Sequence, residues 1–327
     1  RINRETKMIL HIGLPRTGTT TLQKFLFSDE SLFTPSRKLD HKVSKFHRIA
    51  GVGIPLPDSA TDIEDARNTL SEIKRSAQSK LVLISDEKVT SLGNTLAVQD
   101  LYARRLSRID PKAKIIITLR RQQGLMKSRF SQMRIRKHWA ALGLFDTSRH
   151  YLKDRLNKQA RKLMRTLFVP EFVAWSRMGM QNQESCWFSV MNYFDLFNCY
   201  SRIVGHQNVK LLFYEDLKQS PYHFAEQLAK FLGLTPEIIL SAIDNTANPS
   251  PTGIKVWDRV VKNIKCPGEG INLSYAFLYM LGLKTANENN QELLDLVRTH
   301  YGRQNRKLAQ LLGEDLATRG YLMDSDQ

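Results

Sequence analysis

Four short apolar runs, rich in β-branched residues, predict strands that are buried on both faces of a parallel sheet. Apolar residues that recur every three or four positions lie between these runs and predict helices. Strands that alternate with helices indicate an α/β fold in which helices cover both faces of a parallel sheet. The four predicted strands are Met8 to Ile12, Leu81 to Ser85, Lys114 to Leu119 and Val209 to Phe213.

Four helices are predicted by the same pattern. One follows the first strand, and another ends just before the second strand. A third has Ser220 as its N-cap, Pro221 as its first residue and Gly233 as its stop. The fourth runs from about Asn290 to Leu312. Their apolar positions are Leu22, Phe25 and Leu26; Ile63, Ala66, Leu70, Ile73 and Ala77; Phe224, Ala225, Leu228, Phe231 and Leu232; and Leu293, Leu294, Val297, Tyr301, Leu308 and Leu311.

The chain of 327 residues has no repeat, low-complexity segment or Pro/Gly/Ser linker, so we expect one domain over 1–327. Residues 139–208 are mostly helical in pattern and are expected to form an insertion within it. Residues 235–327 are expected to add C-terminal loops and helices.

Polar and charged residues follow each predicted strand. In an open parallel sheet, ligands bind beyond the carboxyl ends of the strands, so these four groups are expected to share one edge. They are Gly13 to Thr21, then Asp86, Glu87 and Lys88, then Arg120 and Arg121 with Ser128 eight positions after Arg120, and finally Tyr214 to Leu217.

The first group has the spacing of a phosphate-binding loop. Gly13 to Thr20 fits the frame G-x-x-x-x-G-x-[ST] between a strand and a helix. Thr19 stands where the kinase and ATPase form of this loop has lysine, and Arg16 supplies a cation inside the loop instead. A turn of this kind directs backbone N–H groups and the positive end of a helix at an anion.

Net charge favours an anionic partner. The chain has 49 Lys and Arg against 32 Asp and Glu, a formal charge of +17. The segment from Arg120 to Arg165 holds 14 Lys and Arg against Asp146 and Asp154, which leaves +12 in a small part of the chain. Nucleotides, nucleic acids, acidic glycans and anionic membrane faces all suit such charge. No recognised nucleic-acid-binding module is present, so nucleic acid is not expected and peripheral contact with an anionic membrane stays open.

Hydrophobic residues make up 42% of the chain and charged residues 25%, which excludes disordered and collagen-like chains. No apolar stretch approaches the ~18 residues of a membrane span. The three cysteines are too few and wrongly spaced for a disulfide scaffold or a zinc site, and we expect free thiols and no metal. We expect a cytoplasmic protein if the source is bacterial, and a Golgi-lumenal one only if an upstream membrane anchor has been removed. The oligomeric state stays open.

Three motifs, in order, resemble sulfotransferases that use 3'-phosphoadenosine 5'-phosphosulfate (PAPS). Gly13 to Thr20 is similar to their 5'-phosphosulfate loop. The strand that ends at Arg120, with Ser128 eight residues later, is similar to their 3'-phosphate element. Phe213 to Leu217, with the helix after it, resembles their Tyr-Glu-Asp-Leu segment. The resemblance covers about residues 8–234 and implies the P-loop-like sulfotransferase fold.

Two departures separate the chain from the cytosolic hormone and drug branch of that family. The Trp after the loop threonines is replaced by Leu22, and the catalytic His of that branch has no counterpart. The chain instead resembles the carbohydrate and tyrosylprotein branch and many bacterial relatives. For the late Gly-rich cofactor loop of the family, Ser250 to Lys255 is the nearest candidate.

The resemblance implies a role for each candidate residue. Arg16 would neutralise the leaving oxygen, and Glu87, in a Glu-Lys pair after the second strand, would take the proton of the acceptor. Asp86 is the competing base, and Arg121 a second phosphate contact. His41, His47 and Lys88 are candidates for acceptor binding. PAPS would be held by Pro15, Arg16, Thr17, Gly18, Thr19, Thr20, Arg120, Ser128 and Tyr214.

The expected function is therefore transfer of a sulfuryl group from PAPS to a hydroxyl of an acidic or carbohydrate acceptor, with adenosine 3',5'-bisphosphate as product. Two alternatives remain. One is a small-molecule kinase of the P-loop type, which the missing loop lysine disfavours. The other is a basic protein that binds a nucleotide or polyanion without chemistry.

Overall fold

Five parallel strands form the central sheet of the computed structural model. It describes residues 8–14, 16–29, 31–34, 46, 50, 62–77, 81–90, 95–130, 172–182, 187–244 and 289–324. The four predicted strands are confirmed, and the fifth has two residues, too few for a detectable periodicity. In spatial order the strands are β2 (Phe33–Thr34), β3 (Leu81–Ser85), β1 (Met8–Gly13), β4 (Lys114–Leu119) and β5 (Val209–Phe213).

The strand register brings the carboxyl ends together. His11 pairs with Ser85 of β3, and Gly13 pairs with Thr118 of β4. Thr118 in turn pairs with Leu212 of β5. The groups that follow β1, β3, β4 and β5 therefore share one edge, as the alternation of strands and helices predicts.

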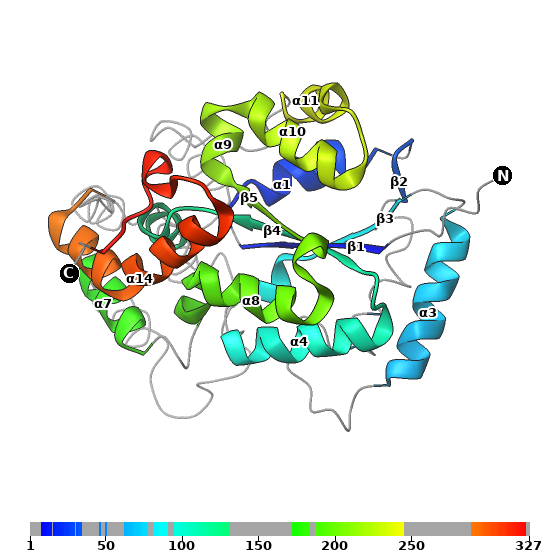
Figure 1. The fold of residues 1–327 in the computed structure, drawn as a ribbon, viewed down its shortest axis with the longest axis horizontal. Helices are drawn as coiled ribbons and strands as arrows, with labels where there is room; N and C mark the ends of the chain where they lie inside the picture. The colour runs from blue at the N-terminus through cyan, green and yellow to red at the C-terminus, as the bar shows by residue number, and fades with distance from the viewer. Residues whose placement is uncertain are drawn as a thin grey trace, which may run out of the picture.

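Helices cover both faces of the sheet (Figure 1). One face carries α4 (Leu96–Ile109) and α8 (Tyr193–Val204). The other carries α1 (Thr19–Thr21), the π-helical turn η1 (Leu22–Leu26), α10 (Pro221–Leu232) and α11 (Pro236–Ile243). The remaining described helices are α3 (Ile63–Ser76), η4 (Glu87–Thr90), the helix at 122–130, α7 (Phe172–Gln181), η6 (Trp187–Met191), η7 (His206–Asn208), α9 (Tyr214–Gln219), α14 (Gln291–Leu312) and η8 (Leu316–Arg319).

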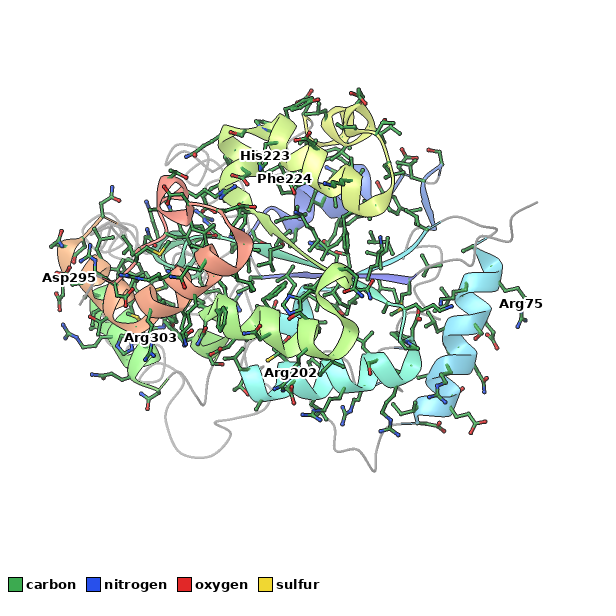
Figure 2. The ribbon with its side chains drawn as sticks, in the orientation of Figure 1. Arg75, Arg202, His223, Phe224, Asp295 and Arg303 are labelled. Carbon is green, nitrogen blue, oxygen red and sulfur yellow. The ribbon has the colours of Figure 1, made fainter. Side chains whose placement is uncertain are left out.

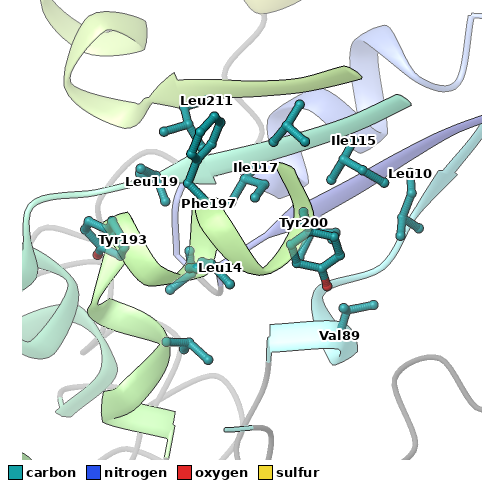
Figure 3. Packing of buried hydrophobic residues seen from close by; sticks show 14 of the residues in the cluster. Leu10, Leu14, Val89, Ile115, Ile117, Leu119, Tyr193, Phe197, Tyr200 and Leu211 are labelled. Atoms are coloured by element: carbon teal, nitrogen blue, oxygen red, sulfur yellow. The ribbon is translucent and has the colours of Figure 1, made fainter. Parts of the chain in front are cut away.

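Successive strand residues alternate between two hydrophobic clusters because side chains in a strand point to opposite faces. Ile115, Ile117 and Leu119 pack toward the ring of Phe197 and its neighbours on α8 (Figure 3). Ile116 belongs to the opposite cluster, with Phe224 of α10. Near-continuous apolar strands are thus explained by burial on both faces.

Within the predicted insertion, α8 is the crossover helix between β4 and β5. Its Tyr200 hydroxyl donates to Gln99 Oε1 of α4 over 2.9 Å, and its Arg202 pairs with Asp100 of α4. Figure 2 labels Arg202 where these two helices lie side by side. This part of 139–208 therefore completes a layer that covers the sheet.

The four predicted helices are present, and the structure differs from the prediction at two residues, Ser220 and Leu311. Ser220 is the N-cap of α10 and Pro221 its first residue, but the Ser220 side chain makes no capping hydrogen bond. Asn290 caps α14 through its side chain, which accepts from the Leu293 N–H. Leu311 of α14 is 41% exposed, whereas its pattern predicts burial.

In the part of the chain that the structure describes, no helix has both the length and the apolar content to span a membrane.

Candidate functional site

The loop after β1 holds two residues in left-handed backbone conformations, Arg16 at φ +77° and Gly18 at φ +81°. The left-handed region costs a residue with a Cβ ~1–3 kcal/mol, and such strain gathers at ligand sites. Gly18 O then accepts from the N–H groups of Thr21 and Leu22, which starts the helix. The loop therefore opens a helix N-terminus toward the shared edge and projects the exposed Arg16 side chain there.

Cations from two strand ends meet at this loop. Arg16 Nε donates to Ser128 Oγ over 2.9 Å, and Arg120 Nη1 donates to the Arg16 carbonyl over 3.1 Å. The Arg120 guanidinium lies 4.7 Å from the centre of the Tyr214 ring, a cation–π contact. Tyr193 Oη donates to the Arg120 carbonyl over 2.6 Å and fixes the end of β4. Four residues predicted from three separate segments thus form one cluster.

The close packing at Gly18 fits a phosphate cradle. A Cβ at this position would lie 2.7 Å from Leu217 Cδ2 and 3.3 Å from Tyr214 Cδ2. Only glycine therefore lets the loop backbone pack against the turn that follows β5, with an exposed arginine beside it. Backbone N–H groups at a helix start, two guanidiniums and a serine hydroxyl suit two phosphate groups, so the residues present fit PAPS.

The turn that carries Glu87 is anchored to the loop. η4 begins at Glu87, two residues after β3 ends. At its other end, Thr90 Oγ1 donates to the Gly13 carbonyl over 2.9 Å and is buried. The backbone of this turn is therefore held beside the phosphate loop. The neighbouring Asp86 lies near α4, since its charge adds to the burial that raises the pKa of Tyr102.

Glu215, directly after Tyr214, is buried, and its carboxylate accepts hydrogen bonds from two other segments of the chain. Its Oε1 accepts from the Arg121 N–H over 3.1 Å, and its Oε2 accepts from Tyr321 Oη over 3.3 Å. Burial raises the pKa of the Glu215 carboxyl above its ordinary value of 4.5, although Arg120 and Arg121 oppose the shift. Glu215 is thus a structural carboxylate that ties the backbone after Arg120 to Tyr321 of the C-terminal segment.

The raised pKa predicts how stability depends on pH. Folded Glu215 binds a proton more readily than the same residue in the unfolded chain, so its contribution to stability is lost as pH rises above about 4.5. Glu215→Gln removes this titration. We expect the free energy of unfolding of Glu215→Gln, relative to wild type, to increase between pH 4.5 and 7 in urea titrations. The exposed Glu72→Gln is the control, and a relative stability that falls with pH contradicts the assignment.

The sequence matches the sulfotransferase domain family over residues 6–250, more than half of the chain. The chain belongs to this family. No curated protein matches it. A sulfotransferase from Alicyclobacillus acidocaldarius is similar in structure, with a TM-score of 0.50 and 14% identity over 95% of this chain and 98% of that chain. This likeness supports the fold.

Weaker structural likenesses are also to sulfotransferases. The sulfotransferase domain of the Synechococcus PCC 7002 olefin synthase has a TM-score of 0.41 and 14% identity, over 97% of this chain and 98% of that one. Mouse sulfotransferase SULT7A1, complexed with PAP, has a TM-score of 0.34 and 15% identity, over 96% and 84%.

The candidate site brings together Arg16, Gly18, Arg120, Ser128 and Tyr214. Thr20 is exposed at the start of α1, whereas Thr19 is buried there. Thr17 is also buried, and its hydroxyl donates inward to the Leu14 carbonyl over 2.7 Å. The side chains of Glu87 and Lys88, the residues Pro15, His41 and His47, and the segment 250–255 lie outside the described residues.

Tyr193 and His11, which support this candidate site, were not predicted from the sequence, and Glu215 was predicted only as part of the segment Tyr214 to Leu217. Tyr193 and Glu215 anchor Arg120 and Arg121, and His11 lies buried directly beneath the loop. For His11 a signal exists, since a polar residue follows buried Ile9 on the same face of β1. Tyr193 lies within a helical pattern, and nothing local separates its anchoring hydroxyl from an ordinary core tyrosine.

Proposed function

We propose that this sulfotransferase moves a sulfuryl group from PAPS to a hydroxyl of a carbohydrate or glycoconjugate. The observation that carries the proposal is the single cluster of Arg16, Arg120, Ser128 and Tyr214 at the loop. PAPS, when bound, supplies the activated sulfuryl group. The chain's own residues have to bind it, neutralise the charge that develops and remove the proton of the acceptor.

Donor binding follows from the chemistry of the cluster. Arg120 and Ser128 are assigned to the 3'-phosphate, since a guanidinium and a hydroxyl donate charge-assisted hydrogen bonds to phosphate oxygens. Gly18, Thr19 and Thr20 are assigned to the 5'-phosphate through the helix start. Tyr214 offers its ring to the adenine.

Arg16 and Glu87 are assigned the reaction itself. The guanidinium of Arg16 stays charged near neutral pH, so it acts electrostatically on the leaving oxygen and gives up no proton. Glu87 would accept the proton of the acceptor hydroxyl, because its turn is tied to the loop through Thr90 and Gly13.

The acceptor is proposed to be acidic. Arg16 is exposed at the loop, and Lys218 lies 5.9 Å from the centre of the Tyr214 ring. The segment from Arg120 to Arg165, with a net charge of +12 from its 14 basic and two acidic residues, continues from this edge along the chain. An electropositive approach raises the local concentration of anionic substrates.

Calorimetry with product and a truncated nucleotide tests the donor assignment. We expect adenosine 3',5'-bisphosphate to bind more than tenfold tighter than adenosine 5'-monophosphate, because each charge-assisted hydrogen bond contributes about 1.5–3 kcal/mol. Ser128→Ala should reduce the difference in affinity between the two nucleotides. Ser71→Ala, which replaces an exposed serine on α3, should leave this difference unchanged. Equal affinity of wild type for the two nucleotides contradicts the assignment. Tight binding of ATP with magnesium points to the kinase alternative.

A further inference from the structure

Three strands carry a polar residue near their carboxyl ends, on the same face of the sheet. Ile9, Leu83 and Ile116 belong to the hydrophobic cluster on the α10 side. Two positions later on that face come His11, Ser85 and Thr118. In register, His11 pairs directly with Ser85, and Thr118 pairs with Gly13 two residues beyond His11. A polar layer therefore lies between the apolar core and the phosphate loop.

These residues form a continuous chain of hydrogen bonds, the buried hydrogen-bond chain, with Gln23 at one end and Thr17 at the other. Gln23 Nε2 donates to Ser85 Oγ over 2.9 Å, and Ser85 Oγ lies 2.7 Å from His11 Nδ1. His11 Nε2 lies 3.3 Å from Thr118 Oγ1, which lies 2.8 Å from Thr17 Oγ1. Thr17 Oγ1 donates to the Leu14 carbonyl.

The direction of the protons is determined from the Thr17 end. At one end, the amide nitrogen of Gln23 is only a donor, so the Ser85 hydroxyl accepts from it and keeps its own proton available for His11 Nδ1. At the other end, the Thr17 hydroxyl donates its only proton to the Leu14 carbonyl, so its oxygen accepts from the Thr118 hydroxyl. Thr118 in turn accepts from His11 Nε2. A neutral His11 therefore carries its proton on Nε2 and accepts from Ser85 at Nδ1.

Burial of His11 supports this assignment. The imidazole is fully buried, and its ring meets Phe27 edge-on at 5.1 Å between centres. Burial lowers the pKa of His11 to about 3, so the ring stays neutral and keeps one donor and one acceptor.

One end of the buried hydrogen-bond chain holds the loop around Arg16. The bond from Thr17 to the Leu14 carbonyl spans Arg16, which is left-handed. A Cβ at Gly13 would lie 2.9 Å from Thr118 Oγ1 and 3.2 Å from His11 Cε1, so the loop backbone rests directly on this chain. Residues with a Cβ keep a left-handed conformation only where the surroundings over-determine it.

The other end reaches the turn of the candidate base. Ser85 is the last residue of β3, and Asp86 N–H donates to the His11 carbonyl over 3.2 Å. Glu87 follows. His11 thus lies between the strand end that carries the base and the loop that carries Arg16.

We propose that His11 is a positioning residue that, through Thr118 and Thr17, fixes the left-handed loop conformation of Arg16 relative to the turn of Glu87. The proposal rests on the proposed function for its effect on turnover. The hydrogen-bond pattern that carries it is independent of the donor and the acceptor.

Thr118→Val tests the link because it removes one hydroxyl from the buried hydrogen-bond chain and keeps the side-chain shape. We expect kcat for PAPS-dependent transfer to fall about tenfold to a hundredfold, as for a catalytic group displaced by about 1 Å. The KM for PAPS should change less, and Thr118→Ser should restore most of kcat. Thr69→Val is the matched control, since this buried threonine hydroxyl of α3 has no hydrogen-bond partner among the described residues.

A double-mutant cycle separates positioning from general damage. If Thr118 acts through Arg16, Thr118→Val should lower kcat by less than about twofold when Arg16 is already alanine, because groups that act as a unit are not additive. The same fold-loss in both backgrounds, or a Thr118→Val variant that behaves like Thr69→Val, overturns the proposal.

Nitrogen NMR of the imidazole gives a readout that does not need activity. We expect His11 to show an unprotonated Nδ1 and a protonated Nε2 throughout about pH 5 to 8, with the signals assigned by their loss in His11→Gln. A proton on Nδ1, or a charged ring in this range, overturns the proposal. Absence of PAPS-dependent transfer in wild type contradicts the proposed function instead, and the NMR signature then decides the tautomer and its hydrogen bonds separately.

Discussion

Replacing Arg16 by alanine is expected to lower kcat about a hundredfold to a thousandfold, the range found for removal of one donor to a developing oxyanion. Charge on the leaving oxygen grows only in the transition state, so affinity for adenosine 3',5'-bisphosphate should change far less than turnover. Steady-state kinetics and calorimetry on the same preparations measure the two effects.

Three substitutions control this result. Arg16→Lys should keep part of the activity, because an ammonium still places a positive charge in the loop. Arg16→Gly should lose activity and gain stability, since glycine adopts φ +77° without strain. Arg75→Ala, on the outer side of α3 (Figure 2), should change neither kcat nor the affinity for adenosine 3',5'-bisphosphate. An Arg16→Ala variant with normal turnover and weakened product binding contradicts the catalytic role.

Local pattern was sufficient to predict the strands that carry the site. Each of the four runs is short, apolar and followed by polar residues, and the carboxyl ends of parallel strands meet by geometry alone. The contact between Arg16 and Ser128, 112 residues apart, follows from this placement. The alternation of strands and helices predicts a parallel sheet, but the order of its strands, with β1 between β3 and β4, comes from the structure.

Features that depend on strand register were beyond local pattern. His11, Ser85 and Thr118 each lie near the carboxyl end of an unremarkable strand, and only the pairing of the strands places them in one layer. Thr17 is one of several threonines in a loop that suits phosphate, and its inward hydroxyl depends on Thr118 beneath it. Leu311 repeats the spacing of buried positions, but it is Leu312 that packs against the core after Leu308, and Leu311 stays exposed.

Glu87→Gln is expected to lower turnover about a hundredfold to ten-thousandfold, the usual contribution of general-base catalysis. Glutamine keeps the size and a hydrogen-bonding oxygen but cannot take a proton at neutral pH. PAPS affinity should barely change, because the donor is assigned to the loop, Arg120 and Ser128. Stopped assays with saturating donor give kcat, and calorimetry gives the affinity.

Asp86→Asn is the matched control because it makes the same chemical change one residue away. The Asp86 backbone is bound to His11 and its charge acts on Tyr102 of α4, whereas Glu87 begins the turn that ends on Gly13. A large loss in Asp86→Asn with a near-normal Glu87→Gln moves the base to Asp86. If both variants keep full turnover, His41 and His47 become the next candidates for the general base. The likeness of this turn to the Glu-Lys pair of glycan sulfotransferases then no longer supports Glu87 as the base.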